Sequence, residues 1–429
     1  MAAKTYFDDQ HFWFPLDNAA KIYPAVQSVA HTTVFRISAI LHDNIHIGSL
    51  LNAVSLTDKR FPYFKVRLCK GLFWYYLEFT DHPLVPVLDE DNCCRAFGGD
   101  KDNGLLFRIL VRKNKVSMEF SHILTDGQGA LVYLKSMLAY YLIERGTNFD
   151  VPLGVMNDPM SEEEFEDAYN RYFKTNIPKV IKYSQAFHLP YPLAGNPKYQ
   201  SITASVPLDM LRAKAHEKKV SITDYLTSVY LFVLQDIYND LPAGSWFRRR
   251  KILRIQVPVN LRKIFPSKTM RNFSLFVLPE IDLRLGDYTF DEILKMVYHK
   301  MQIETDDKLI SKIISRNVGS ERKLFVRSIP LFIKSMLLRY KYYSVGANQY
   351  SGVITNLGKI ELPAQMAEKI DFFSFIPPPP NKKLKINCGI IGFNERLFIT
   401  FGNVSRSNEL EKRFFRFLTG QGIHVKLIL

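Results

Sequence analysis

Cysteine and tryptophan are scarce in this chain of 429 residues, which contains four of the former and three of the latter. Cys69, Cys93, Cys94 and Cys388 have neither the spacing of a zinc site nor the density of a disulfide framework. A disulfide-stapled secreted domain is therefore excluded, and no metal site is predicted. Cysteines that belong to neither a disulfide framework nor a metal site are typical of a reducing compartment, so we expect a cytoplasmic protein.

Long apolar runs are also missing from the sequence. Lys135 and Lys334 interrupt the two longest candidates, so neither reaches the roughly 18 residues of a membrane-spanning helix. Asp8 and Asp9 stand where a signal peptide would carry its basic and apolar regions. We therefore expect neither a transmembrane segment nor a secretory leader.

Positive charge is the main compositional bias. The chain has 57 Lys and Arg residues against 42 Asp and Glu residues, which gives a formal net charge of +15. The cations cluster at Arg248–Lys251, at Lys382–Lys385 and more weakly at Arg322-Lys323. Such clusters bind phosphates, acidic proteins or anionic membranes, or they simply keep a surface hydrated. No nucleic-acid-binding motif accompanies them, so nucleic acid is not an expected partner.

Strand and helix signals alternate along the chain, which favours an α/β or α+β fold with mixed sheets. We expect residues 1–175 to form an N-terminal subdomain and residues 176–429 a C-terminal subdomain. The proline-containing, acidic segment 150–190 predicts a linker with a short helix. In the second part, helical patterns predict helices at residues 208–218, 224–238, 290–304, 325–338 and 408–418.

The most informative segment is Ser121–Gly129, with the sequence SHILTDGQG. Two β-prone runs, 105–111 and 116–121, predict a hairpin that ends just before His122. Apolar residues then recur at helical spacing from 130 to 142, and the glycines let the chain turn between strand and helix. A neutral imidazole held at such a junction can accept a proton near neutral pH.

The spacing H-x-x-x-D-G, formed by His122, Asp126 and Gly127, resembles the active-site motif of the chloramphenicol-acetyltransferase-like superfamily. That superfamily includes condensation domains of peptide synthetases, plant BAHD acyltransferases and alcohol acetyltransferases. The resemblance implies two similar subdomains with a solvent channel between them and the motif histidine in mid-channel.

Later segments match the family in the same order. They are Val257–Arg262 (VPVNLR), Arg271–Ser274 (RNFS) and Thr355–Gly358 (TNLG). Asn387–Gly392 (NCGIIG) occupies the region of the BAHD motif D-F-G-W-G, which is absent. The sequence is therefore most similar to the bacterial alcohol acetyltransferases and not to a plant-type BAHD enzyme.

The resemblance also implies a reaction and roles for the motif residues. His122 is the expected general base in transfer of an acyl group from a CoA thioester to an alcohol or amine. Acetyl-CoA is the implied donor, without a metal or a tightly bound cofactor. Asp126 is expected to be structural and paired with an arginine, for which Arg254 and Arg262 are both candidates. Gly127 is expected to be a backbone requirement, since a side chain would crowd the channel or the turn.

A developing oxyanion needs hydrogen-bond donors near the reacting carbonyl. The candidate side chains are Asn272, Ser274, Thr355 and Asn356, and each of them also fits the role of a loop-forming polar residue. A backbone N–H of Gly127 could serve equally well. Two other functions fit the same sequence. One is a condensation-type enzyme whose acyl donor is bound to a carrier protein. The other is a non-catalytic binding protein on the same scaffold.

Overall fold

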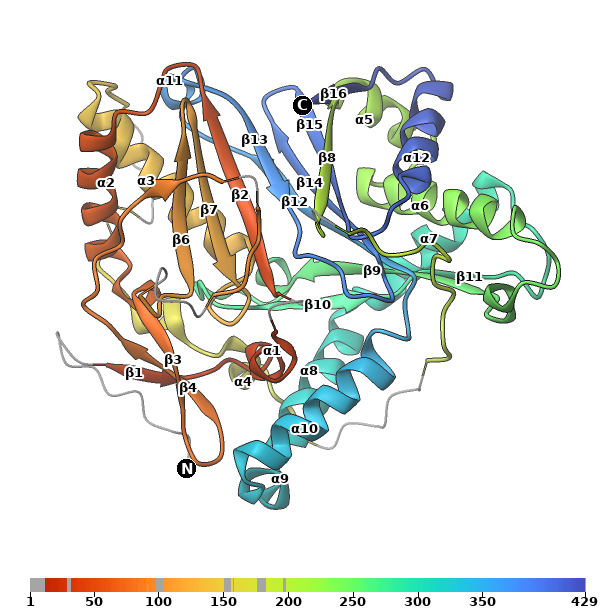
Figure 1. The fold of residues 1–429 in the computed structure, drawn as a ribbon, viewed down its shortest axis with the longest axis horizontal. Helices are drawn as coiled ribbons and strands as arrows, with labels where there is room; N and C mark the ends of the chain where they lie inside the picture. The colour runs from red at the N-terminus through yellow and green to blue at the C-terminus, as the bar shows by residue number, and fades with distance from the viewer. Residues whose placement is uncertain are drawn as a thin grey trace.

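The computed structural model describes residues 12–28, 32–90, 92–97, 103–149, 156, 158–175, 183–195 and 198–428. In these ranges, two large β-sheets lie side by side, and each is covered by helices (Figure 1). Both parallel and antiparallel strand pairs occur. The predicted α/β class with mixed sheets is confirmed.

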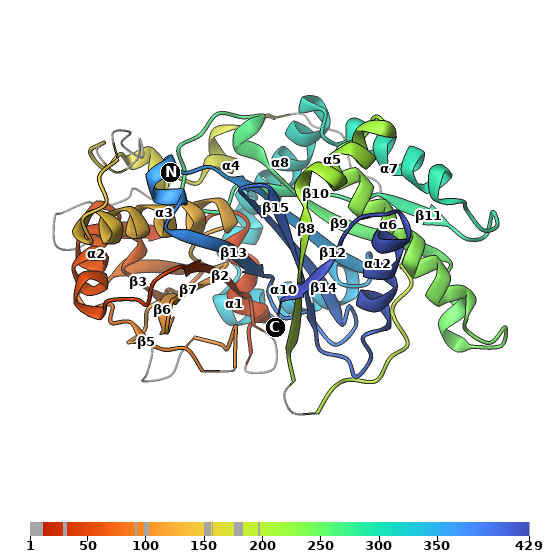
Figure 2. The same ribbon diagram turned by 90° about the horizontal axis from the view of Figure 1, so that it is seen from above.

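The first large sheet has five strands and carries the candidate motif. Helices α2 (Ile47–Arg60) and α3 (Gly127–Glu144) pack on one face of this sheet (Figure 2). The aromatic core side chains Phe35 and Phe120 lie on that face. Burial of these side chains excludes water from the sheet and fixes the strand register. The strand order is β13 (Ile370–Ile376), β2 (Val34–Leu41), β7 (Lys115–Ser121), β6 (Phe107–Arg112) and β5 (Val87–Leu88).

A smaller sheet and several short helices complete the first half. The sheet has three strands, and its core side chains join the same hydrophobic cluster as Phe35. The strands, in spatial order, are β1 (Trp13–Pro15), β4 (Tyr75–Phe79) and β3 (Val66–Lys70). The short helices are α1 (Tyr23–Val26) and α4 (Ala168–Arg171).

The second large sheet has eight strands and forms the core of the C-terminal half. Its central strands β12 and β14 are parallel, whereas β14, β15 and β8 are antiparallel. The order is β10 (Ser274–Val277), β9 (Ile252–Asn260), β12 (Gly352–Ile360), β14 (Ile386–Phe393), β15 (Arg396–Asn403), β8 (Gln200–Pro207) and β16 (Lys426–Ile428), and β11 (Glu280–Asp282) also pairs with β9.

Most of the predicted helices of this half are present with small shifts at their ends. Helix α6 begins two residues earlier than expected because Ser221 and Asp224 form a capping box. The predicted single helix at 325–338 is wrong, because Pro330 separates two shorter helices. The helices are α5 (Leu208–Glu217), α6 (Ile222–Asn239), α7 (Phe290–Glu304), α8 (Asp307–Arg322), α9 (Leu324–Ser328), α10 (Leu331–Lys341), α11 (Ala364–Ala367) and α12 (Glu409–Gly420).

The predicted linker at 150–190 is only partly an exposed connection. Glu164 is buried, and its carboxylate accepts hydrogen bonds from Arg60 at 2.9 and 2.7 Å and from Tyr63 at 2.5 Å. Tyr169 is buried against Phe273 of the second half. The acidic run is therefore held in the structure by a buried ion pair, which its sequence alone did not indicate.

One strand of the C-terminal half lies in the sheet of the N-terminal half. β13, from residues 370–376, lies in the first sheet and pairs with β2. A single boundary between residues 175 and 176 therefore does not separate the two sheets. The boundary itself adjoins residues 176–182, which lie outside the described residues.

Within the described ranges, no helix is long and apolar enough to cross a membrane.

Candidate active site

His122 directly follows β7 and lies between the two halves of the molecule. Its backbone N–H donates to the Thr33 carbonyl at 3.0 Å, which continues the pairing with the segment before β2. Its own carbonyl accepts from the Asn272 side-chain amide at 2.9 Å. The backbone of His122 is thus fixed by one hydrogen bond from each half of the chain.

Two aromatic rings enclose the His122 imidazole. The ring of Phe35 lies 4.7 Å away between centroids, and that of Tyr23 lies stacked at 5.5 Å. The imidazole Nδ1 is buried and has no hydrogen-bond partner. Burial lowers the pKa of His122 below its ordinary value of 6.5, against the opposing effects of nearby Asp126, Asn272 and the Thr125 backbone. The site therefore favours the neutral imidazole, which is the form that can accept a proton.

Asp126 is the N-cap of α3 and faces the second half of the chain. Its Oδ1 accepts from the backbone N–H groups of Gln128 and Gly129, each at 3.1 Å. Arg262 donates to both carboxylate oxygens, at 2.8 Å to Oδ2 and 3.2 Å to Oδ1, and the Phe273 N–H adds a bond of 2.9 Å. These contacts tie the motif to the segment that follows β9.

The arginine that contacts Asp126 is Arg262, and Arg254 has a different partner. Arg254 lies within β9 and forms an ion pair with Glu280 of β11. Arg262 lies in the helical turn after the end of β9, and its Nε also donates to the Thr269 carbonyl at 2.8 Å. Its position beyond the strand lets it reach the N-terminus of α3.

Asn272 holds the backbone of the motif, and both N–H groups of its side-chain amide already donate to groups of the protein. Its amide nitrogen donates to Asp17 at 3.0 Å as well as to the His122 carbonyl. Asp17 is fully buried, and it also accepts from the Ala20 N–H at 2.7 Å. The Arg271 guanidinium lies 3.6 Å from the same carboxylate. In this geometry Asn272 anchors the backbone, which disagrees with its prediction as an oxyanion donor.

The side chains of Asn356 and Thr355 point in opposite directions from β12. The Asn356 amide donates to Thr223 of α6 at 3.0 Å, and its oxygen accepts from the Gly358 N–H at 2.9 Å. Asn356 is therefore turned toward the helices of the second half. Successive residues of a strand alternate between faces, so Thr355 lies on the face toward the first half.

Ser274 and Thr355 keep unused hydroxyl groups. Both residues are half-buried, and neither side-chain oxygen has a hydrogen-bond partner among the described residues. Ser274 begins β10, two residues after Asn272, and its backbone exchanges two hydrogen bonds with the Tyr169 hydroxyl. Of the four predicted side-chain donors, these two remain able to contact a bound molecule.

The glycines of the motif are explained by close contacts and not by backbone strain. Neither Gly127 nor Gly129 has a positive φ. A Cβ on Gly127 would overlap the flexible Leu357 side chain of β12. A Cβ on Gly129 would overlap the carbonyl oxygen of Met270 and the hydroxyl of Thr125, which bond to each other. Gly129 is therefore the stricter requirement of the two.

We expect Gly129→Ala to lower the free energy of unfolding by about 1–3 kcal/mol, because the added methyl group cannot be placed without moving the Met270 backbone. Gly420→Ala is the matched control, since Gly420 also lies in a helix and its Cβ would meet nothing within 4 Å. Urea unfolding followed by circular dichroism measures both variants. Equal stabilities of the two would contradict the proposed overlap.

The cluster Arg248–Lys251 is less available to a partner than its sequence suggests. Arg248 donates to the Leu241 carbonyl at 2.9 Å and stacks over the Tyr238 ring, and Arg250 contacts His188 Nδ1 at 2.9 Å. Burial, together with the nearby cations, lowers the pKa of His188 to about 4. Arg249 is exposed.

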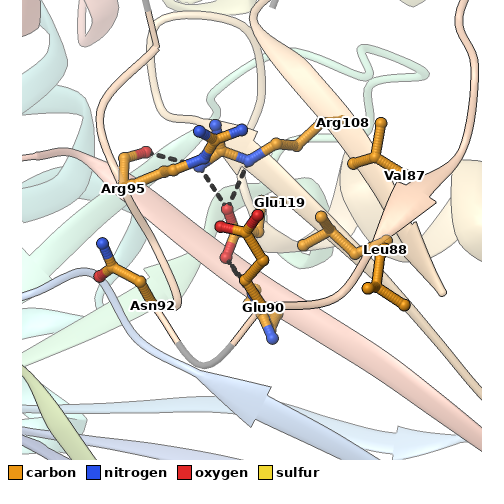
Figure 3. Close-up of a pocket in the computed structure, with 9 residues that line it drawn as sticks. Val87, Leu88, Glu90, Asn92, Arg95, Arg108 and Glu119 are labelled. Atoms are coloured by element: carbon orange, nitrogen blue, oxygen red, sulfur yellow. Dashed lines mark hydrogen bonds and ion pairs between the residues drawn. The ribbon is translucent and has the colours of Figure 1, made fainter. Parts of the chain in front are cut away.

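A separate hollow of about 290 Å³ lies on the other side of the first sheet (Figure 3). Its base is the buried Glu119, which accepts hydrogen bonds from Arg36 at 2.8 Å and Arg108 at 2.7 Å. Arg36, Glu119 and Arg108 are each next to an aromatic core residue of the same strand, Phe35, Phe120 and Phe107 respectively. They therefore face away from the aromatic core that contacts His122. The network stabilises the centre of the sheet and includes none of the predicted site residues.

Three residues that position His122 were not predicted. Asp17, Tyr23 and Phe35 come from the first strands and turns, more than 80 positions before the motif in the sequence. Their residue types carry no local signal, and only the pairing of β2 with β7 brings Phe35 to the site. Within the described ranges, no three His, Cys, Asp or Glu side chains are grouped so that they could hold a metal ion.

Comparison with known proteins finds similarity only at the level of structure. No family model and no curated protein matches the sequence. Polyketide synthase associated protein 5 from Mycobacterium tuberculosis has a TM-score of 0.63 and 12% identity, with 94% of this chain and 96% of that chain covered. TRI101 from F. graminearum, in complex with coenzyme A and deoxynivalenol, has a TM-score of 0.65 and 8% identity, with 97% and 99% covered.

A condensation domain gives a similar match. A mutant starter condensation domain of rhizomide synthetase, in complex with C8-CoA and Leu-SNAC, has a TM-score of 0.58 and 12% identity, with 95% of this chain and 94% of that chain covered. These similarities extend over nearly the whole of each chain and concern the fold. The chain therefore has the two-subdomain fold of the chloramphenicol-acetyltransferase-like acyltransferases and condensation domains.

Proposed function

We propose that this protein is an acyltransferase that moves an acyl group from a CoA thioester to an alcohol or amine, with His122 as the general base. The observation that carries the proposal is the environment of His122. Its backbone is fixed from both halves of the chain, its ring is enclosed by Tyr23 and Phe35, and its Nδ1 is buried without a partner. A structural histidine would instead be expected to have its ring nitrogens bonded.

The proposed reaction uses the other ring nitrogen, Nε2. The acceptor O–H or N–H loses its proton to Nε2 while its oxygen or nitrogen bonds to the thioester carbonyl carbon. The C–S bond then breaks, and the proton passes from the imidazolium to the leaving thiolate. Burial disfavours the charged ring, so the imidazolium is a transient species that returns its proton readily.

Asp126 has a positioning role in this proposal and does not take part in proton transfer. Both of its oxygens are already bonded to Arg262 and to backbone N–H groups. The aspartate therefore holds the start of α3 against the second half, which keeps His122 between the two halves. The Ser274 and Thr355 hydroxyls are the groups that we propose as donors to the oxyanion, because neither has a hydrogen-bond partner among the described residues.

The assay that tests this proposal combines the purified protein with acyl-CoA thioesters, beginning with acetyl-CoA, and a panel of alcohols and amines. Release of free CoA and formation of the acylated product are measured together by mass spectrometry. Transfer from a loaded carrier protein without any CoA turnover would favour the condensation-type function. A CoA-dependent rise in melting temperature without any transfer would favour a binding protein.

We expect the transfer rate to fall on the acidic side of pH 6.5 and to be independent of pH above it. The reason is that burial lowers the pKa of His122 below 6.5, so the active neutral form is lost only as pH falls through that lowered value. The same shift makes the unfolded chain bind more protons below pH 6.5, so stability falls in the same direction. The profile of kcat/KM with an alcohol acceptor, which does not titrate in this range, measures the effect. An acidic limb centred above pH 6.5 would contradict the assignment.

A further inference from the structure

Helices α9 and α10 lie at the edge of the molecule, beside the turn that joins β3 and β4 (Figure 1). The Leu331 N–H of α10 donates to the Leu72 carbonyl of this turn at 3.0 Å. The Lys334 ammonium donates to the neighbouring Phe73 carbonyl at 2.9 Å. The turn and the helix therefore form one connected surface.

Helix α10 directs Lys334 inward and several of its apolar side chains outward. Lys334 is 3% exposed, and its ammonium lies 3.7 Å from the centroid of the Trp74 ring. Phe332 and Met336, one helical turn apart, are 70% and 71% exposed. A helix on a water-facing surface normally has the opposite arrangement. The outward side of α10 is therefore suited to an apolar environment.

Exposed apolar side chains also occur on α9, which precedes α10 in the chain, and on the turn that contacts α10. Phe325 of α9 is 81% exposed, which is unusual for a phenylalanine. Exposed apolar residues that gather in one region indicate an interaction site, whereas scattered ones do not. The apolar face, as we name it, consists of Leu72, Phe73, Leu324, Phe325, Phe332, Ile333, Met336, Leu337 and Tyr340.

The segment that contains α9 and α10 carries charge of one sign only. The sequence from residue 322 to residue 360 contains no Asp or Glu. Arg322 and Lys323 precede α9, and Arg339 and Lys341 end α10, and all four are exposed. Glu321, the nearest acid before this segment, is paired with Lys21. A partner that covers this face must therefore supply negative charge as well as an apolar surface.

We propose that the apolar face docks the protein on an anionic lipid bilayer. The exposed Phe, Leu and Met side chains enter the region between headgroups and acyl chains, and the flanking cations contact the lipid phosphates. A second copy of the chain is a poorer occupant, because a two-fold contact would bring these cations together without an acid in the segment to pair with them.

The apolar face is connected to the candidate site through helix α1, so docking would orient that site relative to the bilayer. The Arg339 guanidinium of α10 donates to the Ala25 carbonyl of α1 at 3.0 Å. Tyr23, which begins the same short helix, stacks on the His122 imidazole. Docking would thus bring the bilayer to the side of the molecule where α1 covers the candidate site.

The experiment is co-sedimentation of the full-length protein with vesicles, and it requires no catalytic activity. Vesicles of phosphatidylcholine alone are compared with vesicles that contain about a quarter phosphatidylserine. We expect the protein to sediment with the anionic vesicles and to be released by added salt, because the cation–phosphate contacts are screened. The triple variant Phe325→Ser, Phe332→Ser, Met336→Ser should lose binding by at least about tenfold.

The control is the double variant Leu285→Ser, Ile303→Ser, because these apolar residues are also exposed but lie outside the apolar face. It should sediment like the wild type, and all three proteins should have the same melting temperature. Failure of the wild type to bind anionic vesicles would overturn the proposal. A second outcome would also overturn it. If the wild type bound no lipid and was a dimer in analytical ultracentrifugation, and the triple variant was a monomer, the face would join two copies of the chain.

Discussion

His122→Ala is expected to reduce acyl transfer by about 10²–10⁴-fold, which is the usual contribution of a general base. The loss follows because no other titratable side chain of the Ser121–Gly129 segment can take the proton, since the Asp126 oxygens are already bonded to Arg262 and to backbone N–H groups. The measurement is single-turnover transfer from acyl-CoA to the acceptor found in the panel assay.

The control for this variant is His216→Ala, because His216 is an exposed histidine on α5. It should transfer at the wild-type rate. Donor binding by His122→Ala, measured by calorimetry, should stay within a few-fold of wild type, because the backbone contacts of His122 do not involve its side chain. Transfer by His122→Ala within about tenfold of wild type would remove His122 from the role of base.

Asp126→Asn is expected to lower the free energy of unfolding by about 3–5 kcal/mol, the cost of leaving one member of a buried ion pair alone. The Asp126 and Arg262 side chains are 9% and 15% exposed. The backbone N–H groups of Gln128, Gly129 and Phe273 now donate to the carboxylate. In the variant, the N–H groups of the Asn amide would face some of these donors, and no hydrogen bond can form between two donors. Chemical unfolding measures the change, and transfer should fall in parallel with stability.

Asp371→Asn is the matched control for the ion pair. Asp371 pairs with Arg396 at a similar distance of 2.8 Å, but both side chains are more than 40% exposed. Exposed pairs of this kind contribute about 0–1 kcal/mol, so the variant should be nearly as stable as wild type. A stable Asp126→Asn protein without transfer activity would show instead that Asp126 acts on the reaction itself.

Sequence patterns predicted the local features of the site because those features depend on neighbouring residues. The hairpin that ends at His122 follows from two β-prone runs joined by a short turn, in which Lys113 adopts a positive φ. Helix α6 was also predicted from its local pattern, although its capping box starts it two residues earlier than expected. The strand-to-helix junction at Ser121–Gly129 is also local, since Asp126 caps the helix that it precedes.

Contacts between segments that are distant in the sequence became known only from the tertiary structure. Arg254 and Arg262 are equivalent by sequence, and only the end of β9 separates the one that pairs with Glu280 from the one that reaches Asp126. Thr355 and Asn356 are adjacent, and the pleat of β12 turns them to opposite faces.

By itself, the sequence determined the α/β class, the strand-to-helix junction and the candidate base, because periodicity, turn residues and capping operate within a few positions. Only the tertiary structure placed β13 in the first sheet, brought Asp17, Tyr23 and Phe35 to His122, and exposed the apolar side of α10. These features depend on which surfaces pack together across long separations in the chain, and local patterns do not carry that information.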